Sequence, residues 1–236
     1  MASTDWAIMS NSLDAASVAR GVTAGIDRPN GGGTHLYGFR AIANGVTGIV
    51  ALRANVANFN PIPGNNGGQI TGSLLRLSGD PAAMSSFLFF QAQSDDVQVA
   101  EGYLLGLSAG DPGAIVLRKG TLVGGLPDAN VGEQGILRKS TESIDLGDWV
   151  HLRLDVIVNP SGDVILRCFR NDLDANPVTA PVWTAIAGMA DFTDDVLGVN
   201  SGSPGLDSGG RAGFAFRSST SGVIGGVDHV TLARTI

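Results

Sequence analysis

The chain of 236 residues has a single cysteine, Cys168, which excludes an internal disulfide and a cysteine-based metal cluster. Charged residues make up only 16%, below the quarter or so that is typical of globular proteins, and aromatic residues only 6%. The 15 Lys and Arg are spread along a chain of net charge −7, which argues against direct nucleic-acid binding, because phosphates require clustered basic side chains. No apolar run approaches the ~18 residues of a membrane span, and the N-terminus has neither the basic nor the apolar region of a secretory signal. We therefore expect a protein made in the cytoplasm, without a membrane anchor.

The C-terminal third alternates between apolar and polar residues with a period of two. In residues 148–158, Val150, Leu152 and Leu154 share one face while His151 and Arg153 point the other way, a pattern that a helix cannot produce. Three further segments are expected to be strands: 163–170, 210–218 and 226–233. Residues 159–163 form the turn between the first two.

Additional strands are expected upstream, separated by turns rich in the 34 glycines. Residues 70–78, 85–93, 97–107 and 135–140 each have strand character. Residues 35–42 and 46–56 flank Asn44 and Gly45, a dipeptide typical of hairpin turns, so we expect these two segments to pair. Ten or more short strands predict an all-β fold, an antiparallel two-sheet sandwich. We expect an extended segment over residues 1–30 and one jelly-roll domain over 31–236.

The order of the strand motifs resembles that of the concanavalin A-like, laminin-G-like jelly rolls. The motifs are Y-L-L-G-L (103–107), I-V-L-R-K-G (115–120), W-V-H-L-R-L-D-V (149–156), G-D-V-I-L-R-C-F (162–169), G-R-A-G-F-A-F (210–216) and V-D-H-V-T-L (227–232). The resemblance covers residues 85–236 and consists of core and turn positions. It therefore implies a fold and leaves activity open.

The catalytic carboxylates of that superfamily have no counterpart here. Its glucanases use an E-x-D-x-x-E strand, because retaining hydrolysis needs two carboxyl groups about 5 Å apart. This chain has no such spacing, and it has no G-x-S-x-G elbow either. Its adjacent acids, Asp95 with Asp96 and Asp194 with Asp195, are interpreted as solvated turn charges. We expect no enzymatic activity.

Calcium is the one cofactor for which a motif exists. Asp172, Asp174 and Asn176 place three oxygen-bearing side chains at alternate positions, as hard cations prefer. However, Pro177 stands where an EF-hand has glycine, and a polar loop using these side chains for local hydrogen bonds explains the motif as well. Three histidines, His35, His151 and His229, lie on separate expected strands with nothing in the sequence to bring them together.

The tryptophans and the cysteine have different expected roles. Trp149 opens a core strand and is expected to pack, whereas Trp183 lies in a loop-like setting and is the candidate for ligand contact. Trp6 is a candidate for anchoring a neighbouring subunit. Cys168 shares a face with apolar residues and is expected to be a small buried hydrophobe.

Two functions remain compatible with these observations. The first is a non-enzymatic structural component of a bacteriophage virion (capsid decoration, tail or fibre base), located in the particle, contacting other virion proteins and forming a homo-oligomer. Its low charge fits a surface that neighbouring proteins cover in part. The alternative is a lectin-like, carbohydrate-binding module that contacts a host glycan.

Overall fold

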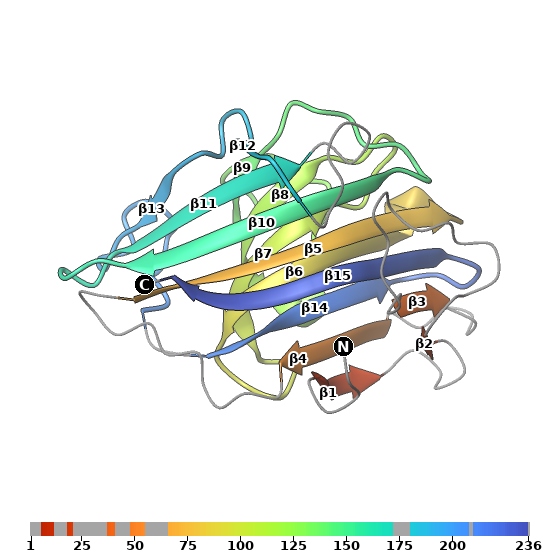
Figure 1. The fold of residues 1–236 in the computed structure, drawn as a ribbon, viewed down its shortest axis with the longest axis horizontal. Helices are drawn as coiled ribbons and strands as arrows, with labels where there is room; N and C mark the ends of the chain where they lie inside the picture. Colours follow the sequence, from red (N-terminus) through yellow and green to blue (C-terminus); the bar gives the residue numbers. More distant parts are fainter. Residues whose placement is uncertain are drawn as a thin grey trace.

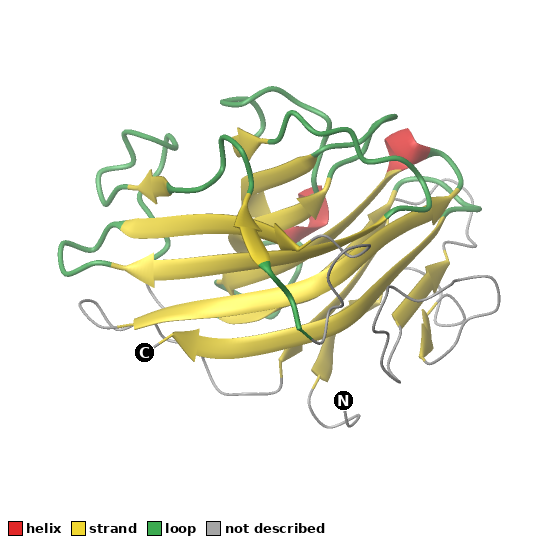
Figure 2. Ribbon diagram, turned by 45° about the horizontal axis from the view of Figure 1, so that its top comes forward, coloured by secondary structure: helices red, strands yellow, loops and turns green. Residues whose placement is uncertain are grey.

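The computed structural model describes residues 6–11, 18–20, 37–40, 48–54, 66–171, 180–207 and 210–235. Every strand pairing among them is antiparallel, and the strands form two stacked sheets (Figures 1 and 2). The seven-stranded sheet has the order β1 (Trp6–Asn11), β4 (Gly48–Ala54), β14 (Arg211–Ser218), β6 (Met84–Ala92), β7 (Glu101–Leu107), β8 (Ile115–Thr121), β9 (Ile136–Lys139). The eight-stranded sheet has the order β12 (Trp183–Ala185), β11 (Val164–Asn171), β10 (Trp149–Val158), β5 (Asn66–Ser78), β15 (Ile224–Thr235), β3 (Tyr37–Arg40), β2 (Val18–Arg20), and β13 (Phe192–Asp194) also pairs with β11. The predicted all-β sandwich is confirmed.

The four C-terminal strands that the alternation predicts are all present, as β10, β11, β14 and β15. β10 and β11 pair from Val158 opposite Val164 onward. The turn between them is held by Asn159, whose side-chain oxygen accepts hydrogen bonds from the backbone N–H groups of Ser161 and Asp163, both at 2.9 Å. This is a local hydrogen bond of the kind that favours Asn in turns.

The predicted hairpin around Asn44 and Gly45 is wrong in its pairing. Both strands exist, but β3 pairs with β2 and β15 in the eight-stranded sheet, whereas β4 pairs with β1 and β14 in the other sheet. Alternation predicts that a segment is a strand but does not choose its partner, and here the chain passes from one sheet to the other. Asn44 and Gly45 themselves lie outside the described residues.

The main core lies between the two sheets. Val150, Leu152 and Leu154 of β10 point into it, and all are at most 3% exposed. Cys168 of β11 lies in the same core with no exposed surface, and burial raises the pKa of its thiol. The prediction that Cys168 is a buried hydrophobe is therefore confirmed.

A second apolar cluster covers the outer face of the seven-stranded sheet. Phe87, Phe89 and Leu104 point outward from β6 and β7 and pack under Leu122 and Leu126 of the segment that follows β8. Loops therefore cover the outside of this sheet. The first thirty residues supply β1 and β2, one to each sheet; the boundary at residue 30 stays a prediction. No helix in the described ranges is long and apolar enough to cross a membrane.

Candidate functional site

The outer face of the eight-stranded sheet carries the polar half of the alternating pattern. Because alternate residues of a strand point to opposite faces, the inward Val150 and Leu152 place His151 and Arg153 outside. Strand register then sets polar side chains of five strands in one row across the sheet: Trp183, Asn171, His151, Ser73 and Asp228. The next two rows add Phe169, Arg153, Thr71 and Thr231, then Arg167, Asp155 and Gln69. We call these twelve residues the Trp183 face.

Aromatic rings and a guanidinium group gather at one end of the Trp183 face. The Trp183 ring stacks on the imidazole of His151, with centroids 5.0 Å apart and an interplanar angle of 27°. The Arg153 Cζ atom lies 4.7 Å from the ring centroid of Phe169 and 5.9 Å from that of Trp183. A cation within about 6 Å of a ring is attracted by its π face. The Arg153 guanidinium group is therefore attracted to the rings of both Phe169 and Trp183.

Asp155 anchors this group in the sheet. Arg153 donates two hydrogen bonds to its carboxylate, from Nε at 2.7 Å and from Nη2 at 2.5 Å. Gln69 of β5 donates a third from Nε2 at 3.0 Å. Such a bidentate pair fixes the plane of a guanidinium group as well as its position. The orientation of Arg153 is thus set before any ligand arrives.

His151 lies at the centre of the Trp183 face and is neutral near pH 7. Its Nδ1 atom is 2.9 Å from the Ser73 hydroxyl oxygen, and only 2% of the residue is exposed. Burial, together with a smaller electrostatic contribution from His229, lowers the pKa of His151 to about 4. The sheet therefore brings His151 and His229 close enough to interact electrostatically, although nothing in the sequence relates them.

A β-bulge in β15 shapes the far end of the row. The register of β15 against β5 shifts between Asp228 and Thr231, and His229 within the bulge has a positive φ of 51°. A non-glycine residue in this region is strained and is a frequent feature of functional sites. The bulge places the His229 Nδ1 atom 3.5 Å from the Asp228 Oδ2 atom.

The three tryptophans have distinct surroundings. Trp183 is partly buried on the face just described. Trp149 packs against the cluster of Leu75, Leu77 and Ile224, as expected. Trp6 lies on β1 of the other sheet and packs edge-on against Phe214, with ring centroids 5.0 Å apart and an interplanar angle of 65°. Its contact with a neighbouring subunit stays a prediction.

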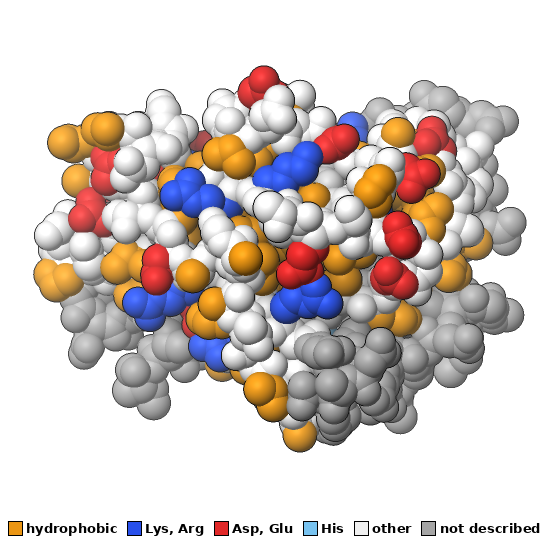
Figure 3. All heavy atoms as spheres, turned by 90° about the horizontal axis from the view of Figure 1, so that it is seen from above, with side chains coloured by type: hydrophobic (Ala, Val, Ile, Leu, Met, Phe, Trp, Pro, Cys, Tyr) orange, Lys and Arg blue, Asp and Glu red, His pale blue; other side chains and the backbone are white. Residues whose placement is uncertain are grey.

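The predicted calcium ligands Asp172, Asp174 and Asn176 lie outside the described residues, so calcium binding stays a prediction. In the part of the chain that the structure describes, no three His, Cys, Asp or Glu side chains lie close enough to hold a metal ion. Seen from above, acidic and basic side chains of described residues are interspersed without a continuous basic patch (Figure 3).

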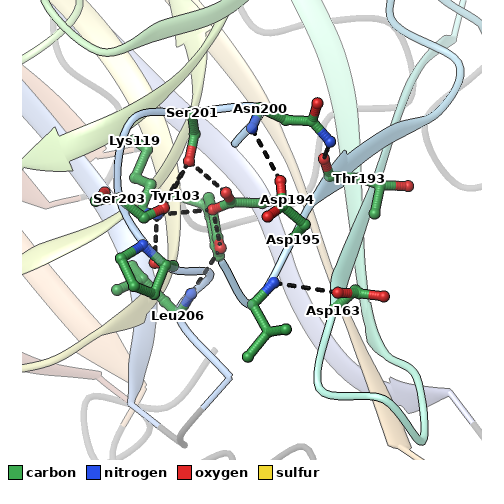
Figure 4. Close-up of polar contacts among 12 residues, drawn as sticks. Tyr103, Lys119, Asp163, Thr193, Asp194, Asp195, Asn200, Ser201, Ser203 and Leu206 are labelled. Atoms are coloured by element: carbon green, nitrogen blue, oxygen red, sulfur yellow. Dashed lines mark hydrogen bonds and ion pairs between the residues drawn. The ribbon is translucent and has the colours of Figure 1, made fainter. Parts of the chain in front are cut away.

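A buried ionic network joins β7 and β8 of the seven-stranded sheet to β13, which pairs with the other sheet (Figure 4). Asp194 has no exposed surface, so its interpretation as a solvated turn charge is wrong. Its Oδ2 atom lies 2.9 Å from the Lys119 Nζ atom and accepts a hydrogen bond from the Tyr103 hydroxyl at 2.6 Å. Ser201 donates to its other oxygen. Burial and the hydrogen bond to Asp194 raise the pKa of Tyr103.

The sequence indicates one member of this network, the buried Lys119. Lys119 shares the inward face of β8 with Ile115 and Leu117, so the alternation of I-V-L-R-K-G places its side chain in the core. A buried lysine requires a partner. No local rule, however, indicates that this partner is Asp194.

Asp195, by contrast, is partly exposed and organises the following loop. Its carboxylate accepts hydrogen bonds from the backbone N–H groups of Leu197, Val199 and Asn200 at 3.0, 2.9 and 2.8 Å. The bonds from Val199 and Asn200 are the main reason that its pKa lies below the usual value. The loop thus holds Leu197 and Val199 in the solvent, 81% and 79% exposed.

Comparison of the sequence with protein families and with curated proteins finds no match. Solved structures do match. The metal-free carbohydrate recognition domain of Emp46p has a TM-score of 0.51 at 10% identity, over 97% of this chain and 88% of that one. The fold is that of the lectin-like, concanavalin A-type jelly rolls. Carbohydrate-binding module CBM66 from Bacillus subtilis (TM-score 0.49, 12% identity, 97% and 94% covered) and an alginate lyase from Corynebacterium sp. (0.46, 12%, 98% and 95%) are also similar. At these identities the likeness concerns the fold alone.

Proposed function

We propose that this chain is a carbohydrate-binding, lectin-like module that holds its ligand at the partly exposed end of the Trp183 face, formed by Trp183, Phe169 and Arg153. The observation that carries the proposal is the arrangement of Trp183, Phe169 and Arg153 beside the polar row of His151. Aromatic rings pack on the apolar C–H face of a sugar, and charged or amide groups bind its hydroxyls. The similarity to the Emp46p carbohydrate recognition domain supports this function over the virion role that was the main expectation from the sequence.

The polar groups of the Trp183 face suit binding better than hydrolysis. Asp155 accepts hydrogen bonds from Arg153 and Gln69, which holds it as an acceptor. Asp155 of β10 lies opposite Gln69 of β5, and Asp228 of β15 lies opposite Ser73, so the two stand on either side of β5 and are offset by four positions along it. Direct neighbours two positions apart along a strand are already about 7 Å apart, so these carboxyl groups do not form the close pair that retaining hydrolysis needs. We therefore propose a non-enzymatic role.

The substitution Trp183→Ala tests the proposal. On an array of glycans, the wild-type protein is expected to bind at least one saccharide in a saturable way. Trp183→Ala is expected to bind it about tenfold more weakly, which corresponds to about 1.4 kcal/mol, while Trp183→Phe retains part of the affinity. Val182→Ala is the matched control, because this neighbouring side chain is 58% exposed. Equal binding by the Ala variants of Trp183 and Val182 refutes the site.

A structural role in a phage virion is the second candidate, and the exposed Leu197 and Val199 favour it. Large apolar side chains held rigidly in solvent are typical of protein contact surfaces. If the chain is a virion component, it is expected to copurify with phage particles as an oligomer. The double variant Leu197→Asp with Val199→Asp is then expected to lose its association with the particles. Unchanged incorporation of that variant refutes a contact through this loop.

A further inference from the structure

A cavity of about 320 Å³ opens where the edge strand β9 of the seven-stranded sheet meets the loop after β13. It shares no residue with the Trp183 face. Its lining includes Val131, Gly132, Ile136, Arg138, Asn200 and Gly202. The volume is at the small end of the range for ligand pockets, about 300 to 1,000 Å³. It therefore suits one small ring rather than an extended chain.

Backbone conformation keeps this cavity open. Gly132 and Gly202 have φ angles of 90° and 81°, which side-chain-bearing residues rarely adopt. A Cβ atom built on either glycine meets no atom within 4 Å, so both positions face open space. The loop carrying Gly202 is fixed by the hydrogen bonds of Asp195, and Ser201 is tied to the buried Asp194. The walls are thus formed before a ligand binds.

Arg138 gives the cavity its charge. A register shift in the pairing of β8 with β9 sets Arg138 opposite Leu117 on the inward face, and the Cζ atom lies 4.5 Å from the ring centroid of Phe192. Among the described residues, its only hydrogen-bond partner is the carbonyl oxygen of Leu137, at 2.8 Å from Nη1, and it forms no ion pair with them. The other described arginines that form ion pairs have carboxylate partners of their own: Arg53, Arg153, Arg167, Arg170 and Arg211.

No acidic side chain is among the described residues that line the cavity, and the nearby Asp194 is neutralised by Lys119. An anion at Arg138 therefore meets no opposing carboxylate in the wall. Guanidinium groups bind carboxylates through two parallel hydrogen bonds. Asn200 uses its Nδ2 atom to hold the carbonyl oxygen of Thr193, so its amide oxygen remains as an acceptor for a hydroxyl. Val131 and Ile136 offer an apolar wall for C–H groups.

We propose that this cavity is a second binding site, independent of the Trp183 face, for a carboxylate-bearing saccharide unit of monosaccharide size. The carboxylate pairs with Arg138, a hydroxyl group donates to Asn200, and the ring packs against Val131. The proposal does not rest on the function proposed above, because no residue is shared by the two sites.

The test is a titration of the ¹⁵N-labelled protein with sodium D-glucuronate, followed by amide chemical shifts. Saturable shifts are expected at Gly132, Gly135, Ser201 and Gly202. Arg138→Gln is expected to weaken binding at least about tenfold, since hydrogen bonds to charged groups are worth about 1.5–3 kcal/mol. Trp183→Ala leaves this binding unchanged, which separates failure of this site from failure of the Trp183 face. D-Glucose, which lacks the carboxylate, binds about tenfold more weakly.

Two matched controls keep the test decisive if Arg138→Gln does not fold. Val131 is 53% exposed, so the variants Val131→Glu and Val131→Gln are both expected to fold. Val131→Glu adds a negative charge to the cavity wall and is expected to weaken glucuronate binding. Val131→Gln adds no charge and is expected to bind glucuronate as the wild type does. Arg53→Gln removes one positive charge on β4, at the other end of the seven-stranded sheet from β9, and leaves binding unchanged. The proposal is overturned if glucuronate gives no saturable shifts, if Val131→Glu binds as well as Val131→Gln, or if acetate binds as tightly as glucuronate.

Discussion

The buried pair of Lys119 and Asp194 gives a sharp test of how the sandwich is held together. Their side chains are 3% and 0% exposed, and the Lys119 Nζ atom also donates to the carbonyl oxygens of Ser203 and Pro204 at 2.8 and 2.5 Å. Lys119→Met removes these bonds and leaves the Asp194 carboxylate in the core without its cation. Removing one partner of a buried pair costs about 3–5 kcal/mol. We expect a loss of this size in the free energy of unfolding.

Urea denaturation followed by circular dichroism measures this loss, with an unchanged slope on denaturant as the check that the folded state is intact. The double variant Lys119→Met with Asp194→Asn is expected to lose less than the sum of the single losses, with a coupling of about 2 kcal/mol, because each single change strands the other group.

A second lysine–aspartate pair supplies the control. Lys139 and Asp128 are also in contact, at 2.7 Å, but their side chains are 29% and 56% exposed. Solvent-exposed pairs contribute about 0–1 kcal/mol, so Lys139→Met is expected to change stability by less than 1 kcal/mol. Equal losses for Lys119→Met and Lys139→Met would falsify the reasoning, because burial would then contribute nothing to the difference.

Three other predictions concern buried polar groups. Arg76, 1% exposed, donates to the carbonyl oxygens of Ser108, Gly110 and Ile144; Arg76→Met is expected to cost at least about 3 kcal/mol in a urea titration, since three buried acceptors lose their donor, and a loss below 1 kcal/mol contradicts it. The pKa of folded His151 is about 4, below its unfolded value near 6.5, so its contribution to the free energy of unfolding is fully present above pH 6.5 and is lost as the pH falls through 4. This contribution is at most about 3 kcal/mol. His151→Gln is therefore expected to flatten the fall in stability between pH 6.5 and 5, and an unchanged fall refutes this. Cys168, fully buried with a raised thiol pKa, is expected to react with iodoacetamide only in denaturant, as mass spectrometry can detect; rapid labelling of the native protein contradicts its placement.

Sequence reasoning was most successful where a structural property depends on near neighbours in the chain. The alternation of residues 148–158 predicted β10 and the two directions of its side chains, so His151 and Arg153 could be assigned to the face opposite the core. It was least successful for pairing. The segments around Asn44 and Gly45 form strands, but β3 and β4 join different sheets, because the partner of a strand is chosen by the packing of the whole sandwich.

In the candidate sites, too, single residues could be predicted from the sequence, whereas their arrangement in space could not. Trp183 could be named from the sequence as a candidate for ligand contact, which stays a prediction, but its row with His151 and Asp228 depends on the register of β12, β11, β10, β5 and β15. The cavity at Arg138 depends on a register shift in β9 and on a loop that follows β13, two segments distant in sequence. No local pattern relates such segments to one another.

The sequence by itself determined the all-β class, the positions of the C-terminal strands, and the burial of Cys168, because a period of two assigns each side chain to one face of its own strand. Only the tertiary structure decided that Asp194 is buried against Lys119, that His151 lies 2.9 Å from the Ser73 hydroxyl, and that Arg138 meets a cavity without a carboxylate partner among the described residues. These relations are contacts between strands far apart in the chain, and they are set by how the two sheets pack rather than by the periodicity of any one segment.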